Sequence, residues 1–287
     1  MVKKIGKEII QILLIGAIVG SFISLFLFCG GKVLSLASNL MTDSRLYVNI
    51  IAIIAGVLVL MLLMLINKYY HKRWYNNGVH LIEEYYESGK DWNPFEQIAL
   101  VFSNTMIAFY GGFLLGSEGP SVTMGASIGL AFNKLFKNDN KDYPKAAASA
   151  GFAVAFLSPV SGLCHLIEEG KKHLSMFLVI RGLFVILIAY LTAYLLHMVL
   201  DFHVIYFDIN ELLPFKYYDV LILVSIISVI VAHLYLLFIR TFSKLKFLQY
   251  FIDGLTLIAL VLLMVARKYH PLMATSGASI LDNNLLD

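Results

Sequence analysis

Charged residues are scarce in this chain of 287 residues, where Asp, Glu, Lys and Arg together make up only 14%. A soluble domain of this length normally has about a quarter charged residues. The scarcity, together with a mean hydropathy of +0.79, excludes an ordinary soluble domain and indicates an integral membrane protein. The net charge of +3 is too small to indicate a nucleic-acid partner.

Cysteine is also scarce, since the sequence has only two, Cys29 and Cys164, both inside apolar stretches. Two isolated cysteines provide neither a disulfide framework nor the spacing of a zinc site. We interpret both as small buried hydrophobic side chains, and we expect neither a metal nor an organic cofactor.

Long runs without a formal charge recur along the chain. A helix needs about 20 apolar residues to cross the hydrocarbon core of a bilayer. Five runs approach or reach this length: Ile9–Phe28, Val48–Ile66, Gln97–Ser117, Gly182–Leu200 and Val220–Ile239. The first run is too long for a signal peptide and has no clear cleavage site, so it predicts a retained spanning helix.

The middle of the chain is irregular, because its uncharged runs are shorter or interrupted. Ala146–Ile167 is long enough to span but contains Pro159, and Gly119–Asn133 and Gly254–Ala266 are short. Non-helical backbone at membrane depth is tolerated where it is buried in protein or lines a cavity, and interrupted helices point to transporter binding sites. The alternative is a set of ordinary helices with proline kinks. We predict an all-α, polytopic integral membrane protein with short, interrupted helices, and a single transmembrane domain over residues 1–287.

Basic residues predict the orientation of the first two spans. One cluster precedes the first span and another follows the second, which puts both on one side of a helical hairpin. The positive-inside rule makes that side cytoplasmic. We therefore predict a multi-pass protein of the plasma membrane with its N-terminus inside. The clusters are Lys3, Lys4 and Lys7, and Lys68, Lys72 and Arg73.

One acid lies within the apolar stretch "LLGSEGPSVTMGASIG", which runs from Leu114 to Gly129. Pro120 suits the first turn of a helix, so Glu118 is expected just ahead of a helix N-terminus. Unsatisfied N–H groups and the helix dipole make such an end an anion site. Ionised Glu118 would compete with a permeant anion there and would leave when protonated. The alternative is a capping acid at an interfacial helix start.

Two segments resemble the CLC family of chloride channels and proton-coupled chloride transporters. "GSEGPSVTMGASIG" is similar to that family's G-[KR]-E-G-P signature, and "AGFAVAFLSPVSGLCHLIEE" is similar to its A-A-F-N-A-P-L-A-G-x-x-F-x-I-E-E segment. The resemblance implies that Glu118 is the gating glutamate and Glu169 the inner proton-relay acid, with Glu168 structural. Without the resemblance, Glu168 and Glu169 would be interpreted as a helix end that meets cytoplasmic lysines.

The resemblance also implies an anion-binding set and shows departures from the family pattern. The G-S-G-I-P signature should fall in "NNGVH", where Asn77 replaces the serine and His80 replaces the proline. Ser117 replaces the usual basic residue beside Glu118. These departures keep a fluoride exporter or a passive anion channel of the same family open as alternatives. The implied anion-binding residues are Gly116, Ser117, Gly119, Pro120, Asn77, Gly78 and Val79.

The resemblance covers the first structural repeat of the family, and "HPLMATSGASILDNNLLD" resembles the start of the second. The later G-x-F-x-P signature would lie beyond residue 287, so a truncated membrane protein that does not transport is an alternative. An intramembrane protease using Ser276 is a weaker alternative, because no base is clearly placed beside it; we predict that the chain is not an enzyme. The resemblance implies proton-coupled chloride transport by a homodimer, with chloride or another small anion, protons and the bilayer as partners.

Overall fold

The computed structural model describes most of the N-terminal two thirds of the chain and part of the remainder. The described residues are 2–70, 84–85, 87–89, 91–113, 116–137, 140–170, 175–200, 226–227, 229–230, 233 and 246–269, without the side chains of 2–5, 67–70, 169–170, 246–253, 267 and 269. The predicted run 220–239 and the residues Asn77, Gly78, Val79, His80 and Ser276 lie outside the described residues or are described only in fragments.

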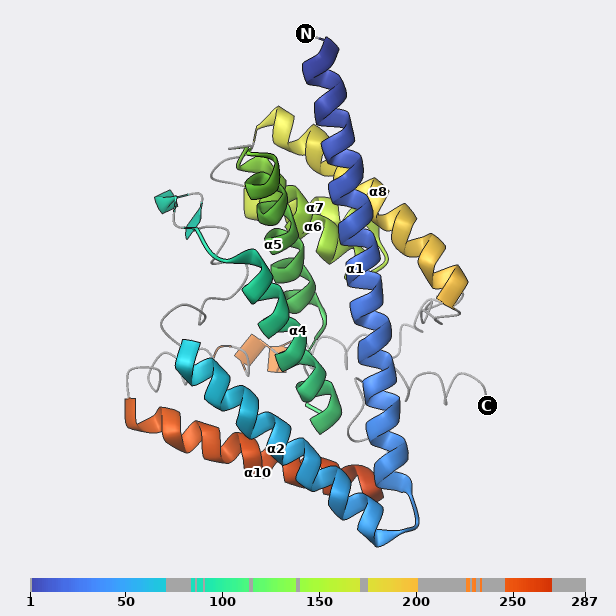
Figure 1. Ribbon diagram of the computed structural model, residues 1–287, viewed down its shortest axis with the longest axis vertical. Coiled ribbons are helices and arrows are strands. Elements are labelled where there is room, and N and C mark those ends of the chain that lie inside the picture. Colours follow the sequence, from blue (N-terminus) through green and yellow to red (C-terminus); the bar gives the residue numbers. More distant parts are fainter. Residues whose placement is uncertain are drawn as a thin grey trace. The chain divides into compact units, whose positions relative to one another are not determined.

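The described elements are all helices, which confirms the predicted all-α class (Figure 1). In chain order they are α1 (Val2–Thr42), α2 (Leu46–Tyr70), α4 (Pro94–Gly111), α5 (Glu118–Phe136), α6 (Asp142–Ala155), α7 (Pro159–Gly170), α8 (Met176–Leu200) and α10 (Lys246–Tyr269). Among the described residues, three segments are long and apolar enough to cross a membrane: Gly6–Thr42, Leu46–Ile66 and Met176–Leu200.

The chain divides into two compact units, Met1–Val204 with Leu260–Asp287, and Ile205–Ala259. In the smaller unit the structure describes mainly the first part of α10. The larger unit contains α1 to α8 and the end of α10, and it contains the candidate site. The expectation of a single transmembrane domain over residues 1–287 stays a prediction.

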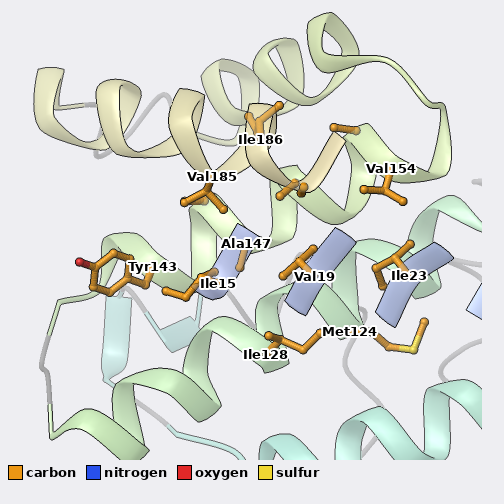
Figure 2. Packing of buried hydrophobic residues seen from close by; sticks show 14 of the residues in the cluster. Ile15, Val19, Ile23, Met124, Ile128, Tyr143, Ala147, Val154, Val185 and Ile186 are labelled. Carbon is orange, nitrogen blue, oxygen red and sulfur yellow. The ribbon is translucent and has the colours of Figure 1, made fainter. Parts of the chain in front are cut away.

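The core of the larger unit forms around the middle of α1. Ile15, Val19 and Ile23 recur every four residues, which places them on one helix face, and all three are fully buried. Figure 2 shows this row between Met124 and Ile128 of α5 and Val185 and Ile186 of α8, with Ala147 of α6 beside it. One face of the N-terminal helix therefore packs against α5, α6 and α8.

Glycines bring α1 directly onto the backbone of α8. A Cβ on Gly20 would lie 2.9 Å from the Cβ of Thr192 and closer still to the carbonyl oxygen of Ala189, and a Cβ on Gly16 would lie 2.8 Å from the side chain of Ile188. Small residues allow such an approach between membrane helices, where packing replaces the hydrophobic driving force.

Helix α8 begins at Met176, earlier than the predicted start at Gly182, and it includes the charged residue Arg181. The guanidinium of Arg181 donates from Nε to Glu8 Oε1 of α1 at 2.5 Å and from Nη1 to Asp142 Oδ2 of α6 at 2.7 Å. Its side chain is only 22% exposed. Two carboxylates from other helices thus neutralise the one cation that would otherwise end the apolar helix.

The span predicted from the uncharged run Gln97–Ser117 also ends in the wrong place, because α4 stops at Gly111. Gly112 adopts the left-handed conformation with φ of 77°, and its N–H donates to the carbonyls of Ala108 and Phe109. Glycine at this position ends a helix without a steric penalty. The resulting break separates α4 from the start of α5, where the candidate site lies.

Candidate functional site

Helix α5 begins at Glu118 itself, with Ser117 as its N-cap residue. The sequence predicted Glu118 just ahead of the helix, and the one-residue difference arises because proline is tolerated throughout a first turn. Pro120 has no N–H, and the first intrahelical bond runs from Ser121 N to Ser117 O at 3.0 Å. The amides of Glu118 and Gly119 have no acceptor within the helix, so this end presents backbone donors and a partial positive charge.

The Glu118 side chain folds back over the preceding loop. Its carboxylate lies against the backbone of Gly116, so that a Cβ on Gly116 would clash with Oε2 and would lie 2.9 Å from Cδ. Glu118 is half-buried in this position. A glycine at position 116 is therefore required for the observed position of the acid, and the carboxylate stays at the positive end of α5.

The other residues predicted around Glu118 lie in the same short segment. Gly116 and Gly119 are exposed, and Ser117 and Pro120 are half-buried. Ser117 has αR backbone angles, with φ of −81° and ψ of −11°, and its side chain does not bond to the helix amides. The four residues are brought together by the turn before α5, and their role in anion binding stays a prediction.

Close backbone contacts hold α5 against α6. A Cβ on Gly125 would clash with the carbonyl oxygen of Ala147, and a Cβ on Gly151 would clash with that of Ser121. Ser121 is fully buried, and its Oγ has no hydrogen-bond partner among the described residues. The first turn of α5 is thus fixed beside Gly151 of α6 with a buried hydroxyl next to the candidate anion site.

Trp92, which sequence analysis missed, braces the other half of α5. Its Nε1 donates to Ser127 Oγ at 3.1 Å, and its carbonyl oxygen accepts from Lys134 Nζ at 2.6 Å. Lys134 also pairs with Asp91 at 2.9 Å. The only available sequence signal was a tryptophan next to an acid just before a predicted span, which indicates no particular contact.

The predicted interruption at Pro159 is confirmed, because α6 ends at Ala155 and α7 begins at Pro159. Leu157 in the break has a φ of 47°, in the left-handed region. Ser158 begins the next helix with a local turn, in which its Oγ accepts from the amide of Ser161 at 3.3 Å. Interrupted helices of this kind are the feature on which the transporter prediction depended.

Glu168 and Glu169 lie in the last turn of α7. Glu168 is exposed. The side chain of Glu169 lies outside the described residues, so its proton-relay role stays a prediction. Within the described ranges, no group of three or more His, Cys, Asp or Glu side chains could hold a metal ion.

A polar contact between α6 and α7 was also missed. Ser149 Oγ lies 3.0 Å from His165 Nδ1, and Ser149 is fully buried. The two residues meet because α7 folds back onto α6 after the break at residues 156–158, and the sequence alone does not indicate this contact.

The apolar helices with short breaks between them define an all-α integral membrane protein. The sequence profile of the family described as "Voltage gated chloride channel" matches residues 58–279, which is most of the chain. The chain therefore belongs to this family, and the family resemblance of its two motifs is confirmed.

Individual relatives match over shorter stretches. The H(+)/Cl(−) exchange transporter ClcA of Vibrio cholerae serotype O1 is 38% identical over 72 residues, which is 24% of this chain and 15% of the relative. Chloride channel protein D of Dictyostelium discoideum is 30% identical over 104 residues, 31% of this chain and 10% of the relative. The H(+)/Cl(−) exchange transporter 7 of Mus musculus is 27% identical over 111 residues, 33% of this chain and 14% of the relative.

The crystal structure of a slow cyanobacterial Cl−/H+ antiporter has the same fold. It superposes with a TM-score of 0.72 and 17% sequence identity, and the match covers 91% of this chain. The chain accounts for 63% of the length of that antiporter, so it spans less than two thirds of the solved relative and a much smaller part of the curated ones.

Proposed function

We propose that this protein transports chloride across a membrane and that Glu118 gates the anion pathway. The observation that carries the proposal is the position of the Glu118 carboxylate, which lies at the first turn of α5 against Gly116. A negative group at a helix N-terminus is stabilised by the helix dipole and by the free amides. A chloride ion is stabilised by the same groups, so the two compete for one place.

The gating step follows from this competition. While Glu118 is ionised, its carboxylate occupies the positive end of α5 and excludes the anion. When the carboxylate takes up a proton or is displaced by chloride, the side chain leaves and the amides of Glu118 and Gly119 become accessible. The anion-binding set we propose comprises Gly116, Ser117, Gly119 and Pro120 in this segment, with Asn77, Gly78 and Val79.

We further propose that transport is coupled to protons, with Glu169 as the inner proton acceptor. Glu169 follows Glu168 in the last turn of α7, and the curated relatives include proteins named as H(+)/Cl(−) exchangers. A homodimer in the plasma membrane, with all 287 residues forming one transmembrane domain, is the form in which we expect the protein to work.

Anion efflux from liposomes tests the gate. The purified chain is reconstituted in chloride-loaded liposomes, and chloride efflux and proton movement are recorded for the unmodified chain, for Glu118→Gln and for empty liposomes. Glutamine resembles a permanently protonated Glu118, so this variant should still pass chloride but should no longer move protons. Efflux no greater than from empty liposomes would support the alternative of a membrane protein that does not transport.

The same preparation tests the inner acid and the anion. Glu169→Gln should abolish proton movement while chloride efflux continues, and continued proton pumping by this variant would count against an exchanger. Loading parallel liposomes with fluoride distinguishes a fluoride exporter, which Ser117 and Asn77 keep open. Chloride flux that never moves protons in the unmodified chain would identify a passive anion channel.

A further inference from the structure

The interface between α6 and α7 contains a half-buried histidine that is held by two contacts. His165 of α7 has its Nδ1 3.0 Å from Ser149 Oγ of α6. The imidazole also stacks on Phe152 of α6, with ring centroids 4.8 Å apart and an interplanar angle of 27°. Two residues of one helix therefore fix the ring, and because Ser149 engages Nδ1, Nε2 is the nitrogen left for proton exchange.

Charged side chains lie at one end of this helical pair. Helix α7 folds back along α6 after the break at residues 156–158, so the start of α6 lies beside the end of α7. Lys145 is one turn before Ser149 and is only 5% exposed, and Glu168 is almost one turn after His165 and is exposed. These are the described charged groups that act on the imidazole, Glu168 from its own helix and Lys145 from α6.

Helix α6 shows where His165 lies between the two proposed proton sites. Along the axis of α6, Lys145 lies at the same height as the end of α7, which carries Glu168 and the backbone of Glu169. The level of Ser149 is about 6 Å further along α6 and carries His165. Gly151 lies about 3 Å further along the same axis, and it contacts Ser121 in the first turns of α5. His165 thus lies at an intermediate level between the acid pair and the helix start that carries Glu118.

We propose that His165 carries protons between the acid pair at the end of α7 and Glu118. The inference rests on the proposed function, and it adds a third proton-carrying residue to it. In the first transfer, from the acid pair to His165, a carboxylic O–H bond breaks as an Nε2–H bond forms. This transfer leaves a carboxylate and an imidazolium. The imidazolium then releases that proton to the Glu118 carboxylate, directly or through water. A histidine is suited to this role because one imidazole nitrogen can accept a proton and later release it, while the other keeps its hydrogen bond.

A purely structural histidine is the competing interpretation, since the contacts with Ser149 and Phe152 alone would stabilise the α6–α7 interface. The family segment quoted above has Phe at this position, so packing by itself does not require a ring that can be protonated. His165→Asn keeps a polar atom near the place of Nδ1 and can still bond to Ser149, but it cannot carry a proton. His165→Phe keeps the stacking and removes the hydrogen bond.

The test measures chloride flux and proton flux together in liposomes containing the full chain. We expect both variants to keep chloride flux within about twofold, while proton flux falls at least about 100-fold, the low end of what one acid–base group contributes. His165→Asn with the unmodified ratio of chloride to protons would overturn the proposal, because then only the hydrogen bond matters. An unmodified chain that moves no chloride would instead overturn the proposed function, and this inference with it.

A second variant keeps the test informative if the His165 substitutions do not fold. Lys145→Gln removes a positive charge that disfavours the imidazolium, so the pH dependence of proton flux should shift to higher pH. An unshifted profile would overturn the proposal. Where His165→Asn folds, the same shift in the Lys145→Gln, His165→Asn double variant would also overturn it, because Lys145 would then act on another group.

Discussion

The carboxylate of Glu118 occupies the space beside the Cα atom of Gly116 that a Cβ atom would fill. Gly116, two positions before the acid, therefore helps to determine where the carboxylate of Glu118 lies. Because the clash of a Cβ would be with the far end of a flexible side chain, the acid can move away at little cost in stability.

Gly116→Ala should therefore displace Glu118 without unfolding the protein. We expect the free energy of unfolding to change by no more than about 0.5 kcal/mol, while chloride efflux and proton coupling shift toward the values of Glu118→Gln. Thermal unfolding and liposome flux measure the two effects. Gly254→Ala is the control for the flux measurement, since it adds the same methyl group where a Cβ meets nothing within 4 Å. Unchanged coupling in Gly116→Ala would show that the observed position of Glu118 does not matter for gating.

Gly20→Ala should weaken the contact between α1 and α8. The new Cβ would lie 3.0 Å from the Cα of Ala189 and nearer to its carbonyl oxygen, and backbone cannot move aside as a side chain can. Gly6→Ala on the same helix adds the same methyl group where nothing lies within 4 Å. The gain in helix propensity cancels in the comparison, so Gly20→Ala should be less stable than Gly6→Ala by about 1–3 kcal/mol. Equal unfolding temperatures for the two variants would contradict the close packing.

Arg181→Gln should destabilise the three-helix contact of α1, α6 and α8. The substitution leaves the carboxylates of Glu8 and Asp142 half-buried without their shared cation, and we expect a loss of about 1–3 kcal/mol. Arg181→Lys keeps the charge but cannot reach both partners with a planar fork, so its loss should be smaller. Unfolding in detergent at several salt concentrations measures both, and an Arg181→Gln variant as stable as the unmodified chain would contradict the prediction.

Acid should loosen the short turn between α1 and α2 only at very low pH. Arg45 donates to Asp43 from its side chain and from its amide, and these bonds lower the pKa of the Asp43 carboxyl from 3.8 to about 2. Because the folded pKa lies below the unfolded one, the stabilising effect is complete above pH 3.8 and is lost as the pH falls through about 2. A carboxyl-carbon NMR titration should give this value, and Arg45→Gln should return it toward 3.8. A pKa near 3.8 in the unmodified chain would exclude the pairing.

Local sequence signals predicted the breaks that position the site. Pro159 marked the start of α7, and Pro120 marked the first turn of α5, because proline restricts backbone angles wherever it occurs. Helix ends set by long-range partners could not be predicted. The predicted span begins only after Arg181, because nothing in the sequence connects this residue with Glu8, 173 positions away.

The site residues also divide into those that local sequence signals predict and those that depend on long-range contacts. Glu118 could be found from its neighbours, since an acid between glycines before a proline implies a helix start whatever the rest of the chain does. Ser149 and His165 could not be paired from the sequence, because their contact exists only after α7 folds back onto α6. Trp92 is similar, since its hydrogen bond to Ser127 joins positions 35 residues apart.

The glycine contacts between α5 and α6 limit how this protein can change shape. Where Gly125 and Gly151 place main chain against main chain, no layer of side chains lies between the helices to accommodate sliding. Any displacement of α5 along α6 would drive carbonyl groups into the facing backbone. The two helices should therefore behave as a rigid pair during the proposed transport cycle, with movement confined to side chains at their ends and to the segments that join them.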